Sequence, residues 1–242
     1  MRDLVAHPFR LPLDVGKLPM AYLLRNGLSY CAVEDRLVFL DLPSDRYFCL
    51  SPAIETEFRR LVDTPAADGA ALERLLPTNL ALPHEWQHGI SQRDAPAVTG
   101  ETHGEPERMT ALDSLSAGGW ILRCRAQLKV RGLARTIQYL SDRKAAAGND
   151  APTIPASHES DPTLARVAGS FHVASHFIGT HKRCLPWSLA IAHRLVSQRI
   201  RPLLVLGVRL TPFAAHAWVQ VDSTLIGERR ERTDMFTPIL VV

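Results

Sequence analysis

The 242-residue sequence predicts an α+β protein built from two parts. Its first third has the pattern of three short strands followed by helices, and its last third has the pattern of a helix followed by strands. Because 46% of the residues are hydrophobic, the chain is long enough to bury a sizeable core. Its length allows one large domain or two small ones, and we expect two.

The amino-terminal part is expected to begin with a small antiparallel meander. Ser51 can cap the helix that follows, with Pro52 at its first helical position. A second helix is predicted over 66–77, where Pro77 stops it, and a third is predicted to begin within 82–90. The three strand-like runs lie at 28–33, 36–42 and 46–50, and the apolar face of the first helix contains Ile54, Phe58, Leu61 and Val62.

A polar stretch rich in Gly and Pro, residues 88–110, predicts a linker. The expected organisation is therefore an amino-terminal domain over 1–87, the linker over 88–110 and a second domain over 111–242. Apolar residues recur at helical spacing from about 110 to 147, and Gly118 and Gly119 are expected to divide this stretch into two helices. Another helix is predicted to begin near Asp161 and Pro162.

The carboxyl-terminal stretch combines a helix with strands. Residues 184–200 place five apolar side chains on one helical face, and 201–210 and 216–222 have the pattern of strands. The chain closes on the apolar run "TPILVV". The five side chains of the helical face are Leu185, Leu189, Ala192, Val196 and Ile200.

Composition and charge exclude several classes of protein. No apolar run approaches the roughly 18 residues that a membrane span requires, and no signal peptide is present, so we expect a cytoplasmic protein without a membrane partner. The four cysteines have neither paired nor zinc-ligand spacing, as expected of reduced thiols. Residues 1–110 hold 11 Lys and Arg against 16 Asp and Glu, and the remainder holds 17 against 9. Because these basic residues are dispersed, we expect no nucleic-acid partner.

Cys184 is a candidate nucleophile because it stands at the start of a predicted helix. A thiolate there is stabilised by unpaired N–H groups and by the helix dipole, and Lys182 and Arg183 add positive charge. A free cysteine is more often a small buried hydrophobic residue. The residues around Cys184 alone favour that second interpretation.

His216, near the start of a predicted strand, can accept the thiol proton if its ring faces the helix terminus. An imidazole in that role needs a third group to orient it. Asp222 lies on the same side of the strand but roughly 20 Å away along it, at ~3.3 Å per residue. Glu228 follows the next turn and can return level with His216. Glu228 is the preferred third group, and Asp222 is the alternative.

Three histidines suggest a metal site that the remaining residues do not support. His172 and His176 have the i, i+4 spacing of a metal-binding pair on a helix, with His181 beyond them. No carboxylate or thiol is spaced as a further ligand. We therefore predict neither a metal nor another cofactor.

The last sixty residues resemble the transglutaminase-like cysteine peptidase domain of the lasso-peptide leader peptidases, the microcin-type B proteins. The matching features are Cys-Leu before a helix, a "VLGV" strand, Pro-Phe-x-x-His-Ala-Trp-Val and a final Phe-x-Pro-Ile-Leu. The resemblance implies a papain-like fold and a Cys-His-acid triad, carried by Cys184 and His216. The acid of that family falls at the position of Glu228 but is more often Asp, so Glu228 and Asp222 both stay open.

Residues 20–80 resemble the small, winged-helix-like leader-recognition domain related to the pyrroloquinoline-quinone chaperone proteins, with "LVFLDLPSDRYFCLS" as the matching motif. In that family the leader peptide adds to the last strand of the sheet, a form of β-augmentation. The resemblance implies that Arg46, Tyr47, Phe48 and Cys49 present this edge. Strand alternation alone would make at least one of Tyr47 and Phe48 a packing residue.

The two resemblances together imply a maturation enzyme. One domain holds the leader of a ribosomally made precursor peptide, and the other cuts the leader from the core. The freed amine then passes to a partner, an asparagine-synthetase-like lasso cyclase that uses ATP and closes an isopeptide ring. Two alternatives are acyl transfer to an amine through the same thioester and a scaffold that binds the precursor without catalysis.

Overall fold

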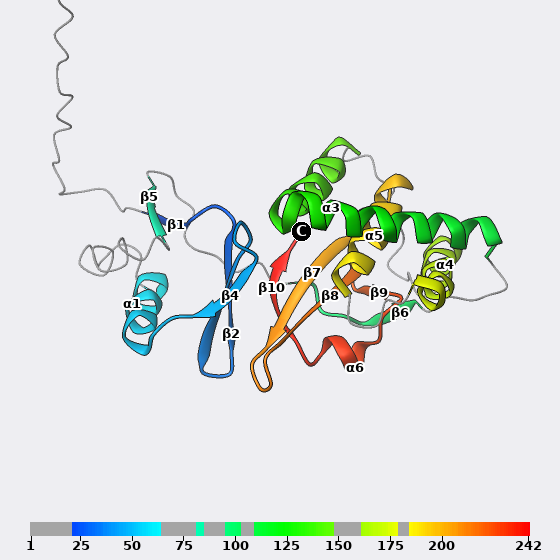
Figure 1. Ribbon diagram of the computed structural model, residues 1–242. Helices are drawn as coiled ribbons and strands as arrows, with labels where there is room; N and C mark the ends of the chain where they lie inside the picture. The colour runs from blue at the N-terminus through cyan, green and yellow to red at the C-terminus, as the bar shows by residue number, and fades with distance from the viewer. Residues whose placement is uncertain (1–20, 64–80, 85–94, 103–108, 148–160, 179–183) are drawn as a thin grey trace, which may run out of the picture.

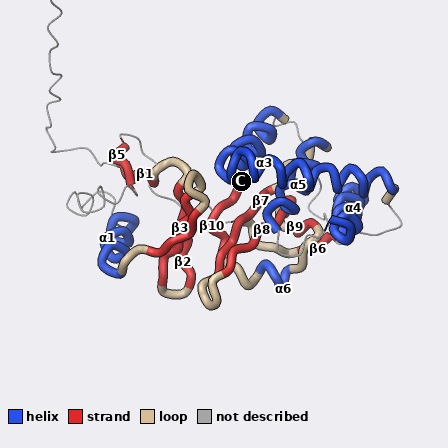
Figure 2. The backbone as a smooth tube through the Cα atoms, in the orientation of Figure 1, coloured by secondary structure: helices blue, strands red, loops and turns tan. Residues whose placement is uncertain are grey.

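The computed structural model describes residues 21–63, 81–84, 95–102, 109–147, 161–178 and 184–242. The helix predicted over 66–77 lies outside them, as do His181, Lys182 and Arg183. The α+β prediction is confirmed, because a three-stranded antiparallel sheet stands beside a larger part in which helices pack on a five-stranded sheet (Figures 1 and 2).

The amino-terminal sheet has the three strands that the sequence predicts. β2 (Leu28–Val33), β3 (Arg36–Asp41) and β4 (Arg46–Cys49) pair antiparallel in the order β2-β3-β4. Each of the two connecting turns contains one residue with positive φ, Glu34 at 54° and Asp45 at 49°. Within the described residues β4 is an edge strand, because it pairs with β3 alone.

One face of this sheet packs against α1 (Pro52–Asp63), which begins at the predicted Pro52. Phe58 is fully buried and makes an edge-to-face contact with Phe39 of β3 at a ring-centroid distance of 5.1 Å. The buried carboxylate of Glu55 accepts a hydrogen bond from the backbone N–H of Leu37 at 3.0 Å and pairs with two arginines. These contacts fasten the helix to the sheet.

The opposite face of the same sheet belongs to the core of the larger part. Alternate residues of a strand point to opposite faces, so Cys31 and Val38 enter the cluster that also contains Leu189 and Ile191. β10 (Thr237–Val241) lies against β2 and β3. The two parts therefore share one hydrophobic core.

The larger sheet has the strand order β10-β7-β8-β9-β6. All its neighbouring strands are antiparallel except β6 and β9, which run parallel. β6 lies within the interval predicted as a linker, while the domain boundaries themselves stay a prediction. The bounds are β6 (Gly100–Thr102), β7 (Leu203–Arg209), β8 (Ala214–Val221) and β9 (Thr224–Ile226).

Three helices form the layer above this sheet: α3 (Ala111–Ala146), α4 (Pro162–Ile178) and α5 (Cys184–Ser197) (Figure 1). α5 packs on β7 and β8, and α3 packs over α5 and α4. Among the described residues, none of the helices is both long and apolar enough to cross a membrane.

One helix prediction is wrong. α3 continues through Gly118 and Gly119 and breaks instead at Gly132, whose φ of 75° and ψ of 176° are not helical. Gly118 serves packing, because a Cβ added there would lie 3.1 Å from Ile178 of α4. A third helix is predicted to begin within 82–90; the structure places 82–84 in β5 (Ala81–His84), which pairs with β1 (Ala21–Leu24), and 85–90 lie outside the described residues.

Candidate active site

Cys184 is the first residue of α5, the position expected from the sequence. The helix is anchored on β8 by Ser188, whose buried hydroxyl donates to the backbone carbonyl of Ala217 at 2.8 Å. This bond fixes the start of α5 beside the strand that carries His216. The thiol is half-buried.

The surroundings of Cys184 favour its thiolate. Burial by itself raises the pKa of the thiol, but His216 and the backbone N–H groups of Ala217 and Leu185 outweigh it and lower the pKa below its ordinary value. The N–H of Leu185 belongs to the first turn of α5, where helical N–H groups have no intrahelical partner. Burial raises the pKa of the two fully buried cysteines, Cys31 and Cys124, to about 12.

His216 lies in β8 with its ring next to two aromatic side chains. The Trp218 ring is stacked with it at 6.1 Å, and the Phe236 ring lies at 5.2 Å. Gly207, the partner of His216 on β7, makes this packing possible, because a Cβ there would lie 2.7 Å from the Trp218 ring. The imidazole is 5% exposed and has little freedom to turn.

Glu228 is the carboxylate that reaches His216. The tight turn between β8 and β9 brings the chain back, and Gly227, with φ of 68°, redirects it at the end of β9. His216 Nε2 lies 2.9 Å from Glu228 Oε2, while the backbone N–H of Arg229 donates to Oε1. Asp222 lies instead in the exposed β8–β9 turn with φ of 51°.

The pKa values of Cys184, His216 and Glu228 are all shifted in the direction that favours the charged form of each side chain. Burial works against the charged form of each residue, but hydrogen bonds to Cys184 and Glu228 raise the pKa of His216 above its ordinary value. Bonds from His216 and Arg229, with the charge of Arg232, similarly lower the pKa of Glu228. Since Glu228 occupies Nε2, Nδ1 is the ring nitrogen left for the thiol. A thiolate beside an imidazolium is the arrangement that activates a cysteine nucleophile.

β4 is the strand expected to bind substrate, and its side chains point alternately to the two faces of the sheet. Arg46 and Cys49 are exposed, whereas Phe48 stacks on Phe39 in the α1 cluster. Tyr47 points the other way and meets the Phe213 ring, in the β7–β8 turn, at 5.6 Å. Burial, then the charges of Asp45 and Cys184, raise the pKa of Tyr47 to about 12. Tyr47 thus links β4 to the surroundings of Cys184.

The histidine pair of α4 does not gather metal ligands within the described residues. His176 Nδ1 lies 2.9 Å from the backbone carbonyl of His172, and the two rings meet edge to face. No group of three potential ligands occurs in the part of the chain that the structure describes.

Sequence reasoning missed Phe213 and Phe236 as neighbours of the site, and it missed the charge of Arg232 beside Glu228. Both phenylalanines stand inside the motif quoted for the carboxyl-terminal stretch, so the signal was present without a role attached to it. Arg232 had no such signal in the sequence. It lies on α6 (Arg230–Thr233), and a helix of four residues is too short to show an apolar periodicity.

Comparison with protein families gives the class of this fold and site. The model of the transglutaminase-like superfamily matches residues 120–241, which include Cys184, His216 and Glu228. The chain belongs to that superfamily, and membership indicates a cysteine-type enzyme in general. Neither the curated proteins nor the solved structures contain a match to the chain.

Proposed function

We propose that this protein is a cysteine peptidase that removes the leader from a ribosomally made lasso-peptide precursor. The observation that carries the proposal is the row formed by Cys184, His216 and Glu228, with its bond of 2.9 Å between imidazole and carboxylate. The resemblance of the last sixty residues to leader peptidases supports the choice of substrate.

In the proposed reaction the Cys184 thiolate attacks the carbonyl carbon of the scissile peptide bond. His216 then donates its Nδ1 proton to the departing amine, so that the C–N bond breaks and a thioester remains. The same nitrogen then takes a proton from water, whose oxygen attacks the thioester carbonyl; the C–S bond breaks, and the Cys184 thiolate and the charged His216 are restored. Glu228 orients the ring and stabilises its positive charge. Backbone N–H groups at the start of α5, including that of Cys184, stabilise the oxyanion.

The amino-terminal sheet is proposed to hold the leader on the edge of β4, at Arg46 to Cys49. Support comes from the open edge of β4 within the described residues and from Tyr47, which reaches the surroundings of Cys184. Because both parts share one core, a leader on β4 keeps the scissile bond at high effective concentration near the thiol. In this proposal residues 1–87 recognise the leader, 88–110 connect, and 111–242 cut. The freed core passes to the asparagine-synthetase-like lasso cyclase.

The peptidase proposal is tested by incubating the full chain with the precursor peptide and following peptide masses. Leader release should fall by at least ~10³-fold in Cys184→Ala, because no other group replaces the nucleophile. Cys124→Ala is the matched control, since that thiol is buried and kept neutral. Binding of the precursor without cleavage by the wild type would leave only the scaffold alternative. An amine adduct without hydrolysis would point to acyl transfer.

Leader binding is tested by hydrogen exchange on Cys184→Ala with and without precursor. Amides of β4 should become protected, whereas those of β6, one of the two edge strands of the five-stranded sheet, should not. Deleting the amino-terminal part is a poor substitute, because the deletion exposes the shared core. Protection at β6 alone would contradict binding at β4.

A further inference from the structure

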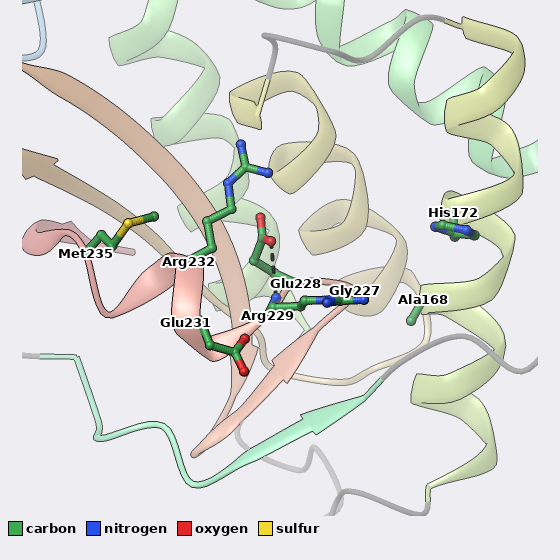
Figure 3. Close-up of a pocket in the computed structure, with 8 residues that line it drawn as sticks. All are labelled: Ala168, His172, Gly227, Glu228, Arg229, Glu231, Arg232 and Met235. Atoms are coloured by element: carbon green, nitrogen blue, oxygen red, sulfur yellow. Dashed lines mark hydrogen bonds between the residues drawn. The ribbon is translucent and has the colours of Figure 1, made fainter.

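A cavity of about 880 Å³ opens beside Glu228. Its walls come from α4, from the turn after β9 and from α6 (Figure 3). This volume lies in the range of pockets that hold small ligands, ~300–1,000 Å³. The candidate active site therefore has a neighbouring space that the proposed reaction at Cys184 does not use.

Two arginine side chains border this cavity, Arg229 and Arg232. Among the described residues, neither has a carboxylate within ion-pair distance, whereas the intervening Arg230 pairs with Asp234 at 3.2 Å. Figure 3 shows Arg229 extending toward α4 and Arg232 rising past Glu228. The carboxylate of Glu231 points to the other side of α6 from the Arg232 guanidinium (Figure 3). The two guanidinium groups are available to an anionic group of a ligand.

Glu228 connects the cavity with the reacting groups. Its Oε2 atom interacts with His216, and the same residue lines the cavity. α4, which forms the far wall, and β4 lie on opposite sides of β7 and β8 (Figure 1). A peptide held on β4 and cut at Cys184 thus has this cavity available to the segment that continues beyond the cleavage point.

We propose that the cavity binds a side-chain carboxylate of the precursor core, on the carboxyl side of the scissile bond. This inference rests on the proposed function, because it needs a leader on β4 and a core that continues past Cys184. An isopeptide ring requires a side-chain carboxylate in the core to react with the freed amine. Arg guanidinium groups bind carboxylates through paired, charge-assisted hydrogen bonds. Arg229 and Arg232 therefore recognise the ring-forming acid before the leader is removed.

The test uses the full chain and two precursor peptides that differ only at the ring-forming residue, as the acid or its amide. The wild type should release the leader from the acid peptide about 10- to 150-fold more efficiently, in kcat/KM, the fold-change that corresponds to a hydrogen bond to a charged group. Arg229→Gln and Arg232→Gln should bring this ratio toward 1, and Arg230→Gln should keep it. Arg232→Gln also lowers both rates through Glu228, so the ratio is the measured quantity.

Two results separate the cavity from the peptidase proposal. A ratio near 1 in the wild type, or an unchanged ratio in both arginine variants, overturns the cavity assignment and leaves leader removal standing. If the wild type releases no leader, the peptidase proposal fails, and binding of both peptides to Cys184→Ala decides the cavity. Fluorescence anisotropy should then show tighter binding of the acid peptide, and equal affinities overturn the assignment.

Discussion

Two buried histidines, His216 in β8 and His193 in α5, have pKa values shifted in opposite directions. His193 is fully buried, with its ring parallel to Trp120 at 5.9 Å. Burial, then the charges of Arg143 and Arg123, lower its pKa to about 4. Burial also acts against the charged form of His216, but the hydrogen bonds to Cys184 and Glu228 raise its pKa.

Burial favours the neutral form of both rings, and the difference shows that the groups beside each ring decide whether this effect is reversed. In the helical layer, burial favours the neutral ring of His193, and Arg143, whose Nη1 lies 3.1 Å from His193 Nδ1, adds a positive neighbour that favours it further. In the sheet, a carboxylate lies at a similar distance from His216, so the charged ring is favoured. Changes around His216 should therefore alter thiol reactivity, and changes around His193 should alter stability.

Of the changes that test this comparison of the two histidines, replacing the carboxylate of Glu228 should have the largest effect on leader release. Glu228→Gln keeps an oxygen that can accept a bond from His216 Nε2, but it loses the charge that stabilises the imidazolium. Leader release should fall by about 10²–10⁴-fold, the range expected when the acid of such a triad is replaced by its amide. Alkylation of Cys184 by iodoacetamide, followed by peptide mapping, should need higher pH than in the wild type. The exposed Cys49 provides an internal reference for reagent and pH.

Asp222→Asn is the matched variant for this experiment, because it removes the other candidate acid from the β8–β9 turn. It should keep both leader release and the pH dependence of Cys184 alkylation. Equal, mild losses in Asp222→Asn and Glu228→Gln would refute the assignment of Glu228 as the orienting acid.

The lowered pKa of His193 in the helical layer should make the free energy of unfolding depend on pH. The pKa of His193 is about 4 in the folded chain and 6.5 ordinarily, so between these values the unfolded chain binds the proton more tightly. The free energy of unfolding should therefore fall by about 3 kcal/mol as pH drops from 6.5 to 4, and this contribution should level off below pH 4. Urea unfolding of the wild type and His193→Gln measures the difference. Parallel pH profiles would contradict the prediction.

A glycine substitution separates the packing of the site from its charge. In Gly207→Ala the new Cβ would lie 2.7 Å from the Trp218 ring and 3.0 Å from Phe236 Cβ, so the two aromatic residues beside His216 must shift. We expect a loss of ~1–3 kcal/mol in unfolding free energy, as for other overpacked cores. Cys184 alkylation should slow as well, because the ring loses its position. Reduced stability with wild-type alkylation would show that the aromatic pair does not hold the imidazole.

The parts of the site that could be predicted from the sequence are those with local signals. Cys184 stands at a helix start and His216 in a strand, and both properties depend on neighbouring residues. The return of Glu228 followed from one tight turn. The approach of Tyr47 to Phe213 could not be predicted, because it depends on how the amino-terminal sheet docks on a core formed by distant segments.

The position of the break in α3 could not be predicted from the sequence either, and substitutions at its glycines should have the smallest effects on stability. Gly132→Ala places a side chain at a φ of 75°, which L residues rarely adopt, whereas an added Cβ at Gly119 meets nothing within 4 Å. Thermal unfolding should show Gly132→Ala destabilised by about 1 kcal/mol and Gly119→Ala stabilised by up to ~1 kcal/mol, since alanine favours a helix over glycine. Neither variant should change Cys184 alkylation, because an added Cβ at either glycine meets nothing within 4 Å. Slower alkylation in Gly132→Ala would mean that the break in α3 also positions α5 and its cysteine.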